Sequence, residues 1–116
     1  MTAYNQKEYI VHYVSDGETK QRACMLKFYE FVTLCGLINL GRNRIVVGEI
    51  VTSARMVSKQ MDAARVQAPL RNLTQMELIK AEKHFDPEIL RRLNVYSPLV
   101  TAVEPVTESQ NTEKTT

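Results

Sequence analysis

The order of apolar and polar positions divides the chain into strand-like and helix-like segments. Residues 8–14, "EYIVHYV", are rich in strand formers and are apolar or aromatic on both faces, so we predict a strand that is covered on two sides. A turn signal, "SDGET", follows, and two interpretations then compete. Asp16 and Gly17 could close a hairpin whose return strand is residues 20–27. Apolar residues from Cys24 to Cys35 recur at helical spacing, however, so we predict a helix over residues 20–34 that stops at Gly36.

The middle of the chain has the most regular pattern. We predict a short buried strand over residues 37–40, "LINL", and a loop over residues 41–44, "GRNR". Apolar positions then alternate in steps of three and four, which predicts a helix over residues 46–67 that Pro69 ends. The seam of this helix consists of Val47, Ile50, Ala54, Val57, Met61 and Ala64.

That seam has two interpretations. It can pack on the sheet that the preceding strands form, which is the one we favour. It can also pair two helices from two chains, as in a coiled coil. Val51 and Met56 widen the apolar arc and are our candidate interface residues.

The last third of the chain is ambiguous. Thr74 with Glu77, and Asp86 before Pro87, are signals that begin helices. Two strands alone make a poor sheet, however, so we prefer a C-terminal hairpin built from residues 75–82 and 94–103. The predicted fold is a two-layer α/β sandwich with the order strand–helix–strand–helix, followed by a C-terminal β-hairpin, with C-terminal helices as the alternative.

The chain of 116 residues is long enough for one domain, which we place at residues 8–103. We expect residues 1–7 to be a flexible arm and residues 104–116 to be a disordered, polar and acidic tail. The start lacks a basic-then-apolar leader, and the longest apolar run is about half the ~20 residues that a membrane span needs. We therefore expect an intracellular protein, cytoplasmic or nuclear, that is not associated with a membrane.

Candidate catalytic and metal-binding groups are sparse. His12, Cys24, Cys35 and His84 lack the close pairs that zinc sites use, so we predict no metal site. The two cysteines would lie about 16 Å apart along one helix, too far for a disulfide, and we expect reduced thiols. The sequence has neither a nucleophile elbow nor a phosphate loop. We therefore predict no catalytic residue and no cofactor.

Basic residues gather before the predicted long helix. Arg42 and Arg44, with Asn43 between them, precede its N-terminus, where free N–H groups and the helix dipole favour a phosphate. The alternative is a solvated loop. Residues 1–103 hold 14 Lys and Arg against 10 Asp and Glu, an excess too small to demand nucleic acid by itself. Farther along the helix, Arg65 lies near Asp62, and a surface ion pair explains that grouping.

The segment "LINLGRNRIVVGEIVTSARMV" resembles a strand–loop–helix segment of the Alba family of small nucleic-acid-binding proteins. The similarity extends over residues 9–61, and the chain departs from the family pattern at residues 43–46 and in the acidic loop at residues 15–18. The resemblance implies a dimer that binds RNA or DNA, with Arg42 and Arg44 facing phosphates. It also implies a mobile hairpin arm near residues 80–95. The cations on or near that arm would be Lys80, Lys83, Arg91 and Arg92.

We therefore expect a non-enzymatic nucleic-acid-binding protein that acts as a homodimer or heterodimer through phosphate contacts. One alternative is a protein-interaction module, a small adaptor or assembly component that binds no nucleic acid. The other is a subunit of an enzyme with a shared site.

Overall fold

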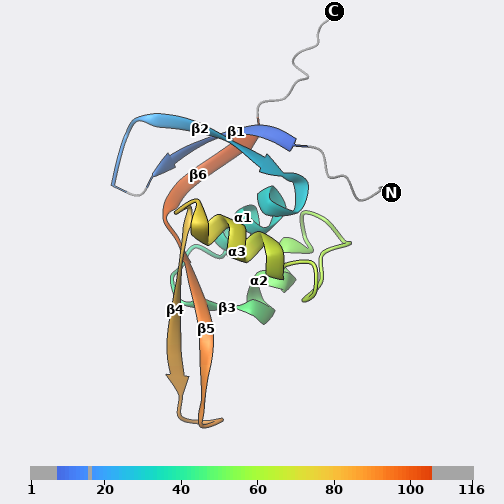
Figure 1. The fold of residues 1–116 in the computed structure, drawn as a ribbon, viewed down its shortest axis with the longest axis vertical. Helices are drawn as coiled ribbons and strands as arrows, with labels where there is room; N and C mark the ends of the chain where they lie inside the picture. The colour runs from blue at the N-terminus through green and yellow to red at the C-terminus, as the bar shows by residue number, and fades with distance from the viewer. Residues whose placement is uncertain (1–7, 16, 106–116) are drawn as a thin grey trace, which may run out of the picture.

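The computed structural model describes residues 8–15 and 17–105, and these residues form a mixed α/β fold (Figure 1). The predicted mixed α/β class is confirmed. The arm at residues 1–7 and the tail from residue 106 lie outside the described residues, and residues 104–105 belong to the last strand. The strands are β1 (Glu8–Ser15), β2 (Gln21–Lys27), β3 (Ile45–Val46), β4 (Ile79–Asp86), β5 (Arg91–Pro98) and β6 (Val100–Pro105). The helices are α1 (Phe28–Leu40), α2 (Val47–Ala54) and α3 (Gln67–Gln75).

The strands form two antiparallel sheets in the described part of the chain, with the orders β2–β1–β6 and β3–β5–β4. The order along the chain therefore differs from the predicted strand–helix–strand–helix, because two strands precede α1 and two helices follow β3. β5 and β6 are separated by Leu99 alone, so the chain passes directly from one sheet to the other. No helix of the described residues is both long and apolar enough to span a bilayer.

The first hairpin corrects the predicted helix over residues 20–34. Strand β2 pairs with β1, which is the alternative that Asp16 and Gly17 suggested, and Gly17 has a φ of 80°. Ile10 pairs with Met25, and these side chains are 49% and 50% exposed. Because Ile10 and Met25 are apolar on the solvent side, the hairpin lacks the alternation of apolar and polar residues that is typical of a half-buried strand. Their exposure also shows that β1 is not covered on two sides, as we had predicted.

Helix α1 corrects two further predictions. Gly41 ends it in the left-handed conformation, with a φ of 67° and an N–H donated to the carbonyl of Ile38, so residues 37–40 are a last helical turn rather than a strand. Gly36, the predicted stop, lies inside the helix. A Cβ atom there would lie 3.0 Å from the backbone nitrogen of Ala54, so this glycine allows α1 and α2 to approach closely.

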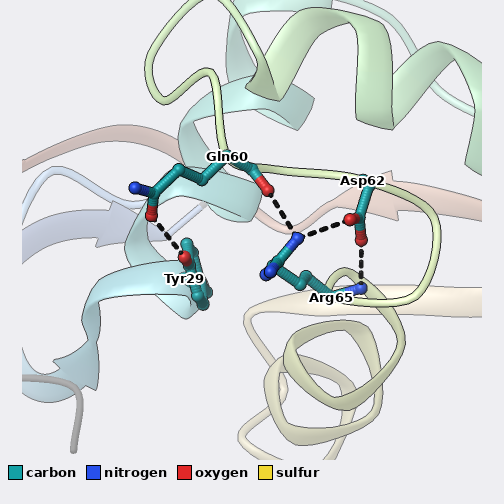
Figure 2. Close-up of polar contacts among 4 residues, drawn as sticks. All are labelled: Tyr29, Gln60, Asp62 and Arg65. Carbon is teal, nitrogen blue, oxygen red and sulfur yellow. Dashed lines mark hydrogen bonds and ion pairs between the residues drawn. The ribbon is translucent and has the colours of Figure 1, made fainter. Parts of the chain in front are cut away.

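The predicted helix over residues 46–67 ends early. Helix α2 stops at Ala54, turns follow, and Pro69 lies in the first turn of α3 rather than ending a helix. Within the turns, the Asp62 carboxylate accepts the backbone N–H of Arg65 at 2.8 Å and pairs with the guanidinium, as Figure 2 shows. The Tyr29 hydroxyl donates to the side chain of Gln60 at 2.9 Å. The Asp62 contact satisfies a backbone N–H outside a helix and so offers the backbone an alternative to a continuing helix.

The second sheet contains a hairpin that projects from the rest of the fold. β4 and β5 pair antiparallel from Ile79 opposite Pro98 to Asp86 opposite Arg91, and Figure 1 shows their hairpin extending away from the helices. The Asp86 side chain accepts the N–H of Glu88 at 2.9 Å, which begins the turn at residues 87–90. Asp86 therefore ends β4 and Pro87 begins a turn, where the alternative had these two residues beginning a helix.

The core lies where α1 packs against both sheets and against the other two helices. The seam of the predicted long helix contributes Ile50, Ala54 and Met61 to it, whereas Val57 is exposed. These seam residues therefore pack within the chain. The largest fully buried side chains are Leu26, Leu34, Leu37, Ile45, Ile50, Met61, Leu70, Leu73 and Ile79.

Candidate nucleic-acid interface

The register of the β4–β5 hairpin assigns each of its side chains to one of two faces. Residues that lie opposite each other in an antiparallel pair share a face, and successive residues alternate. We call one face the neutral face: Lys80, Glu82, His84 and Asp86, opposite Ser97, Val95, Leu93 and Arg91. We call the other the basic face: Ile79, Ala81, Lys83 and Phe85, opposite Pro98, Tyr96, Asn94 and Arg92.

Each cation of the neutral face has a carboxylate beside it. Lys80 Nζ lies 3.3 Å from Glu82 Oε2, and Arg91 stands directly opposite Asp86. Two of the four hairpin cations that the resemblance singled out are therefore balanced locally, and an anion would have to compete with these carboxylates.

The basic face has a different composition. It carries Lys83 and Arg92, and no carboxylate has its register position there among residues 79–98, all of which the structure describes. Phe85 is 51% exposed and stands opposite Arg92. At the base of this face, Arg71 of α3 borders a hollow of about 280 Å³ with Ala81 and Tyr96. Exposed positive charge therefore continues from α3 onto the hairpin.

The loop at residues 42–44 does not belong to the basic face of the hairpin. Arg42 forms an ion pair with Glu49 in the first turn of α2, so its guanidinium already has an anionic partner. Arg44 has a φ of 57°, and its N–H donates to the hydroxyl of Ser97 at 3.0 Å. A second hollow of about 280 Å³ brings Arg44 together with Lys80 of the neutral face; Asn43, Glu82, Ser97, Pro98 and Leu99 complete its lining.

The seven predicted contact residues thus fall into three groups. Arg42 is paired with Glu49 on α2. Asn43, Arg44 and Lys80 share the second hollow, and Arg91 lies on the same face of the hairpin as Lys80. Lys83 and Arg92 lie on the basic face.

Sequence reasoning missed Arg71, Phe85 and Asn94. Phe85 and Lys83 are two residues apart in a strand, so the alternation of side chains could have placed them on one face. Arg71 belongs to α3, which the sequence pattern did not delimit, and its position beside Ala81 depends on how α3 packs.

The cysteines and histidines suggest no chemistry of their own. Cys24 lies in β2 and Cys35 in α1, not on one helix as predicted, and both are free thiols. Burial raises the pKa of Cys35 to about 11, and burial together with Glu30 raises the pKa of Cys24. Both thiols are therefore protonated at neutral pH, unlike a catalytic thiolate. In the part of the chain that the structure describes, no three His, Cys, Asp or Glu residues gather as metal ligands would.

The candidate interface residues Val51 and Met56 differ in exposure. Val51 is half-buried and packs against the core. Met56 is 86% exposed and borders a groove of about 600 Å³ between the end of α1 and α2. The other residues of the groove are Asn39, Leu40, Val46, Gly48, Glu49, Thr52 and Ser53.

In comparisons with known proteins, no protein-family model, no curated protein and no solved structure matches the chain. The properties of the candidate site therefore rest on the contacts and charges of this chain alone.

Proposed function

We propose that this chain is a non-enzymatic nucleic-acid-binding protein that contacts RNA or DNA phosphates through the basic face of the β4–β5 hairpin. The observation that carries the proposal is the segregation of charge by register. Lys83 and Arg92 share a face with the exposed ring of Phe85 and with no carboxylate, whereas Glu82 and Asp86 lie on the other face.

The polyphosphate chemistry of nucleic acid fits this arrangement. Lysine and arginine that neutralise phosphates release condensed counterions, which is the main source of sequence-independent affinity. Arg71 at the base of the hairpin extends the basic face toward the body of the protein. A nucleic-acid strand that lies along the basic face from α3 to the end of the hairpin would contact Arg71, Lys83 and Arg92. It would not pass a carboxylate of the paired hairpin strands.

The loop at residues 42–44 contributes less to the proposal than the hairpin does. Arg42 is paired with Glu49, and Arg44 shares its hollow with Glu82. The proposal also does not depend on the Alba resemblance, whose strand–helix–strand–helix order differs from the order of this chain. Dimerisation remains a prediction, and size-exclusion chromatography with light scattering measures it.

A titration of labelled RNA and duplex DNA at low salt tests the proposal. The double variant Lys83→Glu with Arg92→Glu should abolish binding and leave the fold intact. The double variant Lys80→Glu with Arg91→Glu makes the same charge change on the neutral face and should retain most of the binding. Absence of binding by the wild-type protein to either nucleic acid would sink the proposal. An equal loss in both double variants would show that net charge, not the basic face, governs binding.

The second candidate is a protein-interaction module that binds no nucleic acid. The groove beside α2 favours it, because exposed Met56 and half-buried Leu40 and Val46 form an apolar lining. The same titration separates the two candidates, since the module predicts no binding of RNA or DNA at low salt.

A further inference from the structure

Phosphate binding alone does not explain the exposed aromatic ring on the basic face. Phe85 is 51% exposed near the end of a projecting hairpin, where a ring in contact with water costs free energy. Its cross-strand neighbour is Arg92, and Lys83 precedes it by two residues on the same face. The ring therefore has one cation directly across on β5 and another two residues away along β4.

We infer that the basic face takes single-stranded nucleic acid, with one base stacked on Phe85 and the flanking phosphates on Lys83 and Arg92. The inference rests on the proposed function and names the class of nucleic acid. An aromatic side chain within a basic groove is how sequence-tolerant single-strand binders hold successive bases, because every base has a π-face.

The dimensions of the face agree with this assignment. Residues two apart in a strand lie about 7 Å from each other, and directly opposite residues are about 5 Å apart at Cβ. Long cationic side chains at both distances can reach the phosphates on either side of a base that covers the ring. Asn94 stands opposite Lys83, and its amide offers both a donor and an acceptor to a base edge.

Duplex nucleic acid fits the hairpin less well. The bases of a duplex are stacked on their neighbours and present only edges in the grooves, so the ring of Phe85 has no base face to cover. A hairpin inserted in a groove also has phosphates on both sides. Glu82 and Asp86 on the neutral face would then approach phosphates, whereas a single strand that crosses only the basic face avoids them.

Fluorescence anisotropy with one mixed-sequence oligonucleotide of about 12 nucleotides, within the site sizes known for single-strand binders, tests the inference. The strand is presented alone and annealed to its complement, as RNA and as DNA. A 2-aminopurine in place of one adenine reports stacking through quenching of its fluorescence. Phe85→Leu keeps an apolar side chain but removes the ring, and Phe85→Tyr keeps the ring. Ile10→Ala removes a comparably exposed apolar side chain from the other sheet.

The single strand should bind at least tenfold more tightly than its duplex. Phe85→Leu should weaken single-strand binding about tenfold, as expected for the loss of one stacked base, and leave duplex binding nearly unchanged. Phe85→Tyr and Ile10→Ala should bind as the wild type does. Equal affinity for strand and duplex, or full binding by Phe85→Leu, would overturn the inference while the proposed function stands. If the wild-type protein binds none of the four probes, both the inference and the proposed function fail.

Discussion

The buried carboxylate of Glu30 accepts a hydrogen bond of 2.8 Å from the side-chain amide of Asn72 and so joins the first turn of α1 to α3. The other oxygen of Glu30 accepts the backbone N–H of Lys27 at 2.9 Å. One carboxylate therefore begins a helix and fixes the position of another, 42 residues away. Arg71, the neighbour of Asn72, owes its place at the base of the hairpin in part to this contact.

Replacing Asn72 should destabilise the protein. Glu30 is 7% exposed, and Asn72→Leu removes the hydrogen-bond donor to one of its carboxylate oxygens. We expect this to lower the free energy of unfolding by about 1–3 kcal/mol. Urea denaturation measures it. Asn39→Leu, at an exposed position of α1, is the control and should change stability by less than about 0.5 kcal/mol. If Asn72→Leu lowered the free energy of unfolding by less than about 0.5 kcal/mol, a water molecule would have to replace the amide as the partner of Glu30.

Two helical glycines should respond to alanine with opposite signs. In Gly36→Ala the new Cβ lies 3.0–3.2 Å from the nitrogen, Cα and Cβ of Ala54, and we expect a loss of about 1–3 kcal/mol from overpacking. Gly48→Ala has no atom within 4 Å of the new Cβ and should gain up to about 1 kcal/mol from helix propensity. Urea denaturation of both variants compares them directly. If Gly36→Ala were also stabilising, the contact between α1 and α2 would be looser than the distance indicates.

Salt should weaken nucleic-acid binding in proportion to the number of cations on the path. Three phosphate contacts, from Arg71, Lys83 and Arg92, predict a slope of log K against log salt of about −2 on single strands and −3 on duplex. Arg71→Ala should make the slope less steep by about one contact. Arg55→Ala, an exposed arginine in the turn after α2, should leave the slope unchanged. A slope near zero in the wild type would exclude phosphate contacts as the source of affinity.

The protonated thiol of Cys35 should make stability fall at alkaline pH. Burial raises its pKa from 9.0 to about 11 in the folded protein, whereas the unfolded thiol ionises near 9. The raised pKa therefore stabilises nothing below pH 9, where both states are protonated, and costs stability as pH rises from 9 toward 11, because only the unfolded state then loses its proton. Urea denaturation of the wild type and of Cys35→Ala measures the difference. The decline should be shallower in the variant, and equal declines would contradict the assignment to Cys35.

The sequence pattern predicted local features well where one interaction dominated. The strand at residues 8–14, the loop at residues 41–44 and the mixed α/β class all follow from propensity and spacing. Strand β2 was missed because Met25 is apolar on its exposed side, so its pattern did not alternate. The end of α2 at Ala54 was missed because the apolar steps of three and four continue past it in the sequence.

The candidate site was predictable in its residue types but not in its arrangement. Clusters of arginine and lysine are visible in the sequence, whereas their partners are not. Glu49 pairs with Arg42 because α2 follows the loop at residues 42–44 and β3 directly, and Arg71 borders the hairpin because α3 packs at its base. The division of the hairpin side chains into a neutral and a basic face depends on the register of β4 against β5. The sequence of one β-strand does not reveal that register.

That register also limits how the length of the hairpin can change. An insertion of one residue in each strand below Lys83 would turn the Lys83, Phe85 and Arg92 side chains to the opposite side of the sheet, toward the loop at residues 42–44. An insertion of two residues in each strand would restore their side and move them farther from α3. A change of even length in both strands would therefore keep the proposed binding side, and a change of odd length would turn these side chains to the other surface of the hairpin.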